Sequence, residues 1–561
     1  NRIENLLLFL KSVAILTLSK SESSRNTLSQ YQSNQNVNKY FHPTSDVEIE
    51  CGPVRGYLAE DGDYYAFLGI PYASPPIGKR RFKAPFPAPY WTTTFHANRT
   101  VKCPQLGQGD EDCLVLNVFT PTKIIHGPLP VLVYIHGGSF LINSGPTKGM
   151  EPLIRQNVIV VTLNYRLGAL GFLCLGIKDA SGNAGLKDQV QVLKWIRGNI
   201  EFFGGDPNKV TVYGMSAVGA SVELLLLSDS AKHLFHKAII ESGTATSVWA
   251  VDANPIETAY SLANAVAFPN KVPDVTKLAE FYKNVSADVL STENNKLYQN
   301  LTDGTFGFVP CLETKVFGNA PFITTSPIEL IKLGEYTKVP MLFIFGSSEG
   351  LYFKSSDYKK LNYKEKMAAN FGDFMPADLV FDTKEIRDAI TENVRNFYFG
   401  NKTVGDNTLR EYLNYFGDHL VMQGLLNSAV TYSKNSPVYM MEFAYKGNLG
   451  STDEYFDFLN VAGHGDALKY VILAKRIKDK NDQLIVNRMV RLVANFMKYS
   501  NPLPTRIEML PIQWPAVQPE KVTYLRMNTN LQVYEEPVWD RKRFWDALYD
   551  IYRRIPQQVQ P

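Results

Sequence analysis

The sequence predicts an α/β fold in which a large, mostly parallel central sheet has helices on both faces. Six short apolar runs rich in valine and isoleucine are taken as its strands, at 131–135, 158–163, 210–213, 237–240, 340–345 and 438–443. Strands that are apolar along their whole length are typical of sheets buried on both faces. Apolar residues at helical spacing between 185 and 196 predict a helix between the second and third runs. A helix in that place crosses from one parallel strand to the next.

A single large domain over residues 47–550 is the simplest organisation. The chain is 45% hydrophobic and 20% charged, which is ordinary for a soluble globular protein. No internal repeat and no linker rich in glycine and proline interrupts this range. The segment 250–335 has helical patches without a clear strand, so we expect an insertion that shapes a pocket. Residues 551–561 are a polar tail that carries no signal for a membrane or lipid anchor.

The first 46 residues are expected to lie outside that domain. Residues 1–18 combine an early arginine with a short apolar run, which resembles a secretory signal; an amphipathic helix is the alternative. The run is shorter than the about 20 residues that span a bilayer. Residues 19–46 are polar and predicted to be disordered. Four glycosylation sequons, which favour a secreted protein, begin at Asn98, Asn284, Asn300 and Asn401.

Charge and cysteine content exclude several classes of function. The net charge is +3, with 58 basic and 55 acidic residues, so nothing points to nucleic acid as a partner. The five cysteines lack the number and spacing of a zinc site, and no metal or organic cofactor is expected. Cys103 and Cys113 are close enough in sequence to close a small loop. The odd count leaves at least one free thiol, and the pairing of Cys51, Cys174 and Cys311 stays open.

A serine follows the third predicted strand, in Gly-Met-Ser-Ala-Val at 214–218, and a helix of small residues begins at once. Such a sharp strand-to-helix turn, called a nucleophile elbow, lifts a serine hydroxyl clear of the sheet and is typical of acyl transfer through a serine ester. The usual pattern has glycine two residues after the serine, where this chain has Val218. We expect this β-branched side chain to tilt the turn and displace the N–H of Ala217, unless Gly219 absorbs the strain.

A serine nucleophile needs an imidazole base and a carboxylate that orients it. In proteins whose serine lies on such a turn, the three residues follow one another along the chain in the order serine, acid, histidine. Two histidines lie far downstream of Ser216. His419 lies in a helical pattern, whereas His464 is flanked by glycines, so His464 is the predicted base. Glu349 follows the strand at 340–345 in a turn of serine and glycine and is the predicted acid; a solvated loop glutamate is the alternative.

Donors for the oxyanion of the tetrahedral intermediate are predicted at the end of the strand at 131–135. The strand ends in His-Gly-Gly, and paired glycines let backbone N–H groups approach a ligand closely. We expect the N–H groups of Gly137, Gly138 and Ala217 to bind the oxyanion. His136 is then a structural member of this loop and not the base.

Taken together and in this order, these motifs resemble the type-B carboxylesterases of the carboxylesterase/cholinesterase family, which belongs to the α/β-hydrolase superfamily. The other matching segments are Phe-Leu-Gly-Ile-Pro-Tyr-Ala at 67–73, Glu-Asp-Cys-Leu at 111–114, Gly-Asn-Ala-Gly-Leu-Lys-Asp-Gln at 182–189, Phe-Gly-Gly-Asp-Pro at 203–207, Glu-Ser-Gly at 241–243 and His-Gly-Asp at 464–466. Within the family, the general pattern resembles insect secreted esterases. The resemblance implies an α/β-hydrolase fold and a triad of Ser216, Glu349 and His464. It also implies a disulfide between Cys103 and Cys113.

The chain departs from the family pattern in three places. Val218 replaces the elbow glycine, and Phe268 stands near the place where a cysteine of the family's second disulfide is expected. The Cys103–Cys113 loop is too short to hold the tryptophan with which cholinesterases bind a quaternary ammonium group. We therefore do not expect choline esters as substrates.

The sequence thus predicts a secreted serine carboxylesterase that cleaves a small-molecule ester through an acyl-enzyme intermediate. Neither a nucleic acid nor an integral membrane segment is expected to take part. The alternative, prompted by Val218, is a catalytically weak or inactive cholinesterase-like binding or adhesion protein on the same scaffold. The natural ester and the oligomeric state stay open.

Overall fold

The computed structural model describes residues 44–560, except 270–273, 299–300, 354, 452–454 and 474–476. The chain divides into a small unit, Asn1–His42 with Lys123–Gly127, and a large unit, Pro43–Thr122 with Pro128–Pro561. The predicted leader at 1–18 and nearly all of the predicted polar segment at 19–46 lie outside the described residues. The first strand begins at Asp46. All elements described below belong to the large unit.

The elements of the large unit alternate between strands and helices over most of its length. The strands are β1 (Asp46–Ile49), β2 (Gly52–Arg55), β3 (Tyr57–Leu58), β4 (Tyr64–Pro71), β5 (Phe95–His96), β6 (Val115–Pro121), β7 (Leu129–Ile135), β8 (Ile159–Leu163), β9 (Gly205–Met215), β10 (Lys237–Glu241), β11 (Met341–Gly346), β12 (Val438–Phe443), β13 (Thr523–Met527) and β14 (Gln532–Glu535). The α-helices are α2 (Glu151–Ile154), α3 (Gly168–Phe172), α4 (Ala184–Asn199), α5 (Ala217–Leu227), α6 (Pro255–Ala265), α7 (Val275–Asn284), α8 (Ala287–Tyr298), α9 (Pro327–Leu333), α10 (Gly350–Phe353), α11 (Ser355–Lys360), α12 (Tyr363–Ala369), α13 (Lys384–Phe399), α14 (Leu409–Gly417), α15 (Gln423–Ser433), α16 (Lys480–Tyr499) and α17 (Trp539–Tyr552).

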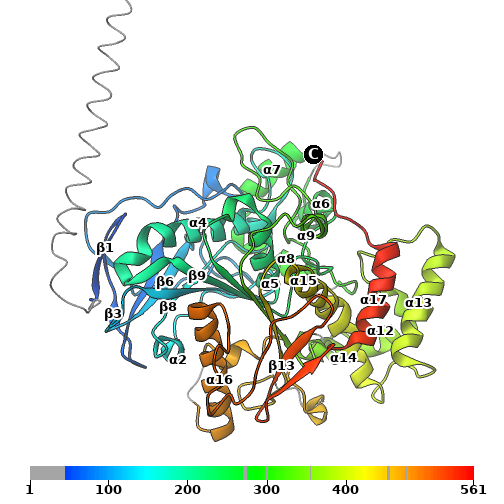
Figure 1. Ribbon diagram of the computed structural model, residues 1–561. Coiled ribbons are helices and arrows are strands. Elements are labelled where there is room, and N and C mark those ends of the chain that lie inside the picture. Colours follow the sequence, from blue (N-terminus) through cyan, green and yellow to red (C-terminus); the bar gives the residue numbers. More distant parts are fainter. Residues whose placement is uncertain are drawn as a thin grey trace, which may run out of the picture. The chain divides into compact units, whose positions relative to one another are not determined.

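Among the described residues, an 11-stranded sheet runs in the order β14-β13-β12-β11-β10-β9-β7-β8-β6-β4-β3 (Figure 1). Neighbouring strands from β8 to β13 are parallel, and the strands toward both edges pair antiparallel. The six runs predicted from the sequence are β7 to β12. Every residue of β7, β8, β10 and β11 is buried, as expected for strands covered on both faces. The predicted fold class is confirmed.

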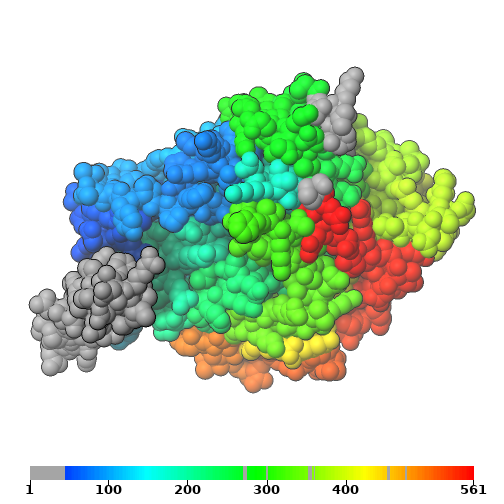
Figure 2. All heavy atoms as spheres, turned by 90° about the horizontal axis from the view of Figure 1, so that it is seen from above, coloured from blue at the N-terminus to red at the C-terminus, as the bar shows by residue number. Residues whose placement is uncertain are grey.

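Helices cover the sheet on both faces. Figure 1 shows α4, the predicted crossover helix, on one side of the sheet and α2 and α16 on the other. Apolar side chains of α2 and α16 form one buried cluster with residues of β7, β8, β9 and β11. On the C-terminal side, Figures 1 and 2 show α17, in red, beside the yellow-green segment that contains α13. The rings of Phe397 and Phe544 stack between these two helices at a centroid distance of 3.9 Å.

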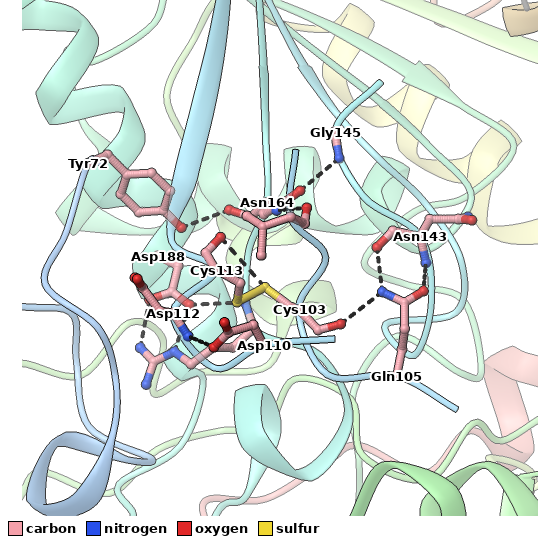
Figure 3. Close-up of a disulfide and its surroundings, with 12 residues drawn as sticks. Tyr72, Cys103, Gln105, Asp110, Asp112, Cys113, Asn143, Gly145, Asn164 and Asp188 are labelled. Atoms are coloured by element: carbon pink, nitrogen blue, oxygen red, sulfur yellow. Dashed lines mark hydrogen bonds and ion pairs between the residues drawn. A yellow bond between two sulfur atoms is a disulfide. The ribbon is translucent and has the colours of Figure 1, made fainter. Parts of the chain in front are cut away.

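The described residues contain two disulfides. Cys103–Cys113 closes the loop implied by the family resemblance, and Gln105 and Asn143 fasten that loop to the segment after β7 (Figure 3). The second disulfide joins Cys174 to Cys311, a pairing that the sequence had left open. The domain therefore has a second bridge although Phe268 stands where a cysteine was expected, and Cys51 is the free thiol.

The predicted insertion contains helices, and residues of the predicted tail contact the domain. Helices α6 to α9 lie within 250–335, and the described part of this segment contributes no strand to the sheets. Residues after α17 return to the domain, since Val559 donates a backbone hydrogen bond to Leu312 at 2.9 Å. No helix in the described part of the chain is long and apolar enough to cross a membrane.

Candidate active site

Ser216 stands on a sharp turn between the end of β9 and the start of α5. Its backbone angles are φ 63° and ψ −130°, which an L-residue adopts only where its surroundings enforce it. Its N–H donates to the carbonyl of Glu241 on β10 at 2.8 Å, and its own carbonyl accepts from the N–H of Gly219 at 2.8 Å. These bonds fix the turn from both sides. The backbone therefore adopts the sharp turn that the sequence predicts at Ser216.

The side chains of Ser216, His464 and Glu349 form a continuous chain of hydrogen bonds. The Ser216 Oγ lies 2.9 Å from His464 Nε2, and His464 Nδ1 lies 2.7 Å from Glu349 Oε2. All three residues are buried, with exposed fractions of 5%, 4% and 3%. They come from three separate loops at the carboxyl ends of neighbouring parts of the sheet, and the fold brings them together.

Two further groups hold the Glu349 carboxylate. Its Oε1 accepts hydrogen bonds from the Ser242 hydroxyl and the Gly346 N–H, each at 2.7 Å. The loop of His464 is held in turn by Asp466, whose Oδ2 accepts from the N–H of Gly463 at 2.7 Å. Ser242 and Asp466 belong to family motifs in the sequence, and neither is among the predicted site residues. Asp466 could have been suspected from its place two residues after the predicted base, whereas Ser242 is 107 residues from Glu349 and no sequence signal links the two.

The His-Gly-Gly loop after β7 lies directly against the elbow. A Cβ atom added at Gly137 would lie 2.4 Å from the carbonyl oxygen of Met215 and 3.3 Å from the Cβ of Ser216, so only glycine fits there. Within the described residues, none of the backbone N–H groups of Gly137, Gly138 and Ala217 donates to a protein acceptor. These donors therefore stay available beside the serine hydroxyl.

His136 supports this loop and does not reach the serine through a hydrogen bond. Its Nδ1 lies 3.0 Å from the Gly137 carbonyl, and its ring stacks on Tyr165 at a centroid distance of 4.7 Å. Burial lowers the pKa of His136 to about 4, because the imidazolium loses its hydration. The ring is accordingly neutral at physiological pH.

A sequence profile described as the carboxylesterase family matches residues 43–545. The chain belongs to the carboxylesterase family. Juvenile hormone esterase of Tribolium castaneum is 31% identical over 499 residues, which cover 82% of this chain and 84% of that protein. Neuroligin-2 of Mus musculus is 29% identical over 563 residues, covering 88% of this chain and 63% of that protein.

A solved structure shares the fold of this carboxylesterase-family chain. The crystal structure of juvenile hormone esterase from Manduca sexta, with OTFP covalently attached, superposes with a TM-score of 0.79 at 27% identity. The match covers 90% of this chain and 99% of that one. The fold is thus that of the α/β-hydrolases, as the sequence predicted. Family membership also supports carboxylic ester hydrolysis as the general class of activity.

Val218, the departure from the family pattern in the elbow, is accommodated by its neighbours. The side chain is fully buried, and a Cβ added at Gly214 would lie 2.9 Å from Val218 Cγ1. The close approach between α5 and the chain after β10 occurs at Gly219, one residue after Val218. A Cβ at Gly219 would lie 2.5 Å from the carbonyl oxygen of Gly243. The backbone keeps the sharp turn at Ser216. This agrees with the expectation that Gly219 compensates for Val218.

Substituting Val218→Gly is accordingly expected to lower stability and to leave kcat within about threefold of the wild type. Loss of a fully buried valine from a helix lowers the free energy of unfolding by about 2–4 kcal/mol. Urea unfolding and turnover of a short p-nitrophenyl ester measure the two effects. Val222→Gly, at an equally buried position of α5, is the matched control. A tenfold rise of kcat in Val218→Gly alone would show that the valine strains the elbow.

Glu241, whose carbonyl holds the elbow, carries a buried carboxyl group. Oε1 accepts from the N–H of Leu468 at 3.2 Å, and Oε2 accepts from the Tyr213 hydroxyl. Burial is the main cause that raises the pKa of Glu241 from 4.5 to about 8, and the nearby carboxylates of Glu349 and Asp466 add to it. The side chain of Glu241 is therefore protonated at neutral pH.

The raised pKa of Glu241 predicts a pH-dependent stability. Between pH 4.5 and about pH 8 the unfolded chain releases this proton while the folded chain keeps it, so the free energy of unfolding falls as pH rises. One such group contributes about 1.4 kcal/mol per pH unit. Between pH 5.5 and 7.5, the free energy of unfolding measured with urea should fall by about 3 kcal/mol less in Glu241→Gln than in the wild type. The exposed Glu385→Gln is the control, and equal losses in all three proteins would contradict the assignment.

The remaining predicted residues lie away from this centre. His419 is buried in a helical turn with its Nδ1 2.7 Å from the Tyr415 carbonyl, so it is not the base at Ser216. Asn98, Asn284 and Asn401 are exposed, and Asn300 lies outside the described residues. No group of three or more histidine, cysteine, aspartate or glutamate side chains in the described ranges is arranged to hold a metal ion.

Proposed function

We propose that the protein is a serine carboxylesterase with Ser216 as nucleophile, His464 as general base and Glu349 as the acid that orients the imidazole. His464 Nε2 accepts the Ser216 hydroxyl proton as Oγ attacks the ester carbonyl carbon. The N–H groups of Gly137, Gly138 and Ala217 bind the oxyanion. His464 then protonates the leaving alcohol, and an acyl-enzyme remains on Ser216. Water hydrolyses it by the same proton transfers in reverse order.

The observation that carries this proposal is the geometry of the three side chains. The distances of 2.9 Å and 2.7 Å suit proton transfer from serine to imidazole and a charge-assisted bond from imidazole to carboxylate. Burial of all three residues strengthens these interactions because water does not screen them. The two hydrogen bonds at Glu349 Oε1 hold the carboxyl group in place, so that Oε2 faces the imidazole of His464.

We also propose that the protein is secreted. The support is the signal-like leader, the exposed sequons at Asn98, Asn284 and Asn401, and two disulfides, which persist in oxidising compartments.

Two observations favour a second function, binding without turnover. Neuroligin-2 is a relative that matches 88% of this chain, and Val218 departs from the hydrolase elbow. Against this candidate stand the hydrogen-bonded triad and the preserved turn at Ser216.

Covalent labelling separates the two functions. A fluorophosphonate probe reacts with an activated serine, so we expect a single adduct on the peptide that contains Ser216, together with loss of p-nitrophenyl acetate hydrolysis. Absence of both the adduct and hydrolysis in folded protein would support the binding function instead.

A further inference from the structure

A cleft of about 760 Å³ adjoins the proposed active site. Three stretches of chain form its walls: residues 99–102 before the first disulfide, residues 143–148 after β7, and residues 468–472 after the loop of His464. Its floor includes Gly137 and Met215.

One end of the cleft is lined by immediate neighbours of the nucleophile and the base. Gly137 lies against the Cβ of Ser216, and Met215 immediately precedes that serine. The thioether of Met215 also lies against the loop of the base, since a Cβ at Gly465 would be 3.0 Å from its sulfur. A group bound in the cleft therefore lies close to the position of the reacting ester.

The charged residues that line the cleft are all basic: Arg99, Lys102, Lys148 and Lys469. No aspartate or glutamate is among its lining residues. A cleft lined by one sign of charge attracts ligands of the opposite sign.

Two of these cations are neutralised and two are not. Arg99 pairs with Asp112 at 3.4 Å, and Lys469 pairs with Asp466 at 2.9 Å. Lys102 and Lys148 are exposed, and neither forms an ion pair with a described residue. The cleft consequently carries about two uncompensated positive charges.

A buried side chain ties the two lysine-bearing walls together. Asn164 Nδ2 donates to the carbonyl of Val101 at 2.8 Å, and its Oδ1 accepts from the N–H of Gly145 at 2.9 Å (Figure 3). Asn164 is 4% exposed, so these bonds are shielded from water. The segments that carry Lys102 and Lys148 are thereby held at a fixed separation, which reduces the ordering cost of binding an anion between them.

We infer that the ester cleaved at Ser216 carries an anionic group, a carboxylate, phosphate or sulfate, on its alcohol portion, and that Lys102 and Lys148 bind this group. The inference rests on the proposed esterase function. The alcohol portion is specified because His464 delivers the proton to the leaving oxygen, and one wall of the cleft begins four residues after His464, at Leu468. The acyl carbon–oxygen bond breaks as that oxygen gains the proton, and the acyl group remains on Ser216 Oγ.

A pair of esters of the same size tests this inference. 4-Acetoxybenzoate has an anionic alcohol portion and 4-acetoxybenzamide has a neutral one. We expect the wild type to have the higher kcat/KM for the anionic ester. In the double variant Lys102→Gln/Lys148→Gln, the ratio of the two kcat/KM values should fall roughly tenfold at low salt. The double variant Lys194→Gln/Lys332→Gln changes the net charge equally, at exposed positions on α4 and α9, and should keep the wild-type ratio.

The outcomes separate this inference from the proposed function. Equal kcat/KM for both esters, unchanged in Lys102→Gln/Lys148→Gln, would overturn the inference and leave the esterase proposal standing. If neither ester is hydrolysed, calorimetric binding of 4-hydroxybenzoate and 4-hydroxybenzamide decides. Tighter binding of the anion that is lost in the lysine double variant supports the cleft's role without catalysis. Equal binding, or none, overturns it.

Discussion

Ser216→Ala is expected to lower kcat for a short p-nitrophenyl ester by roughly 10⁴- to 10⁶-fold. The alanine removes the atom that forms the acyl-enzyme and leaves His464 without a proton to accept. The residual rate comes from whatever the oxyanion donors and substrate binding contribute without a nucleophile. Initial rates at saturating ester measure the loss, and the fluorophosphonate adduct should disappear with it.

Stability should change little in Ser216→Ala, because the turn is held by the backbone bonds of residues 216 and 219 and not by the serine hydroxyl. Urea unfolding therefore serves as the control for folding. Ser230→Ala, at an exposed serine outside the site, should keep full activity. Turnover by Ser216→Ala within tenfold of the wild type, in a preparation free of other esterases, would reject the nucleophile assignment.

Glu349→Gln is expected to lower kcat by roughly 10³- to 10⁴-fold with a much smaller effect on KM. An amide at this position lacks the negative charge that stabilises the imidazolium formed in the transition state. If the amide oxygen keeps the hydrogen bonds from the Ser242 hydroxyl and the Gly346 N–H, the amide NH2 faces His464 Nδ1, so the ring of His464 loses its fixed tautomer. Steady-state kinetics measure both parameters.

A second Glu→Gln substitution, outside the site, shows whether the loss of one negative charge alone changes kcat. Glu385→Gln removes the same charge from the exposed first turn of α13 and should leave kcat unchanged. Equal kcat values for Glu349→Gln and the wild type would mean that another group orients His464.

The central strands, and the three candidate residues that the structure brings within hydrogen-bond distance, could be picked out in the sequence because both depend on strong local patterns. The runs at β7 to β12 are apolar along their whole length, and Ser216, Glu349 and His464 each stand in a short turn rich in glycine or serine. Strand β13 was not predicted. Its five residues, Thr-Tyr-Leu-Arg-Met, form no continuous apolar run of the kind seen in β7 to β12.

Features that depend on residues far apart in sequence were not predictable in this way. Cys174 and Cys311 are 137 positions apart, and no local pattern pairs them. The effect of Val218 depends on which residue of α5 approaches Gly243, which only the three-dimensional packing decides. The basic cleft is likewise assembled from three segments, each of which looks unremarkable alone.

The bridge between Cys174 and Cys311 has a practical consequence for recombinant production. A cross-link over so long a stretch reduces the entropy of the unfolded polypeptide considerably, by about 5 kcal/mol in the chain-entropy picture. In a bacterial cytosol, glutathione and thioredoxin keep both thiols reduced, so this contribution is missing while the enzyme folds. Export to the periplasm, or expression in insect cells, is therefore the appropriate route to material for the kinetic experiments.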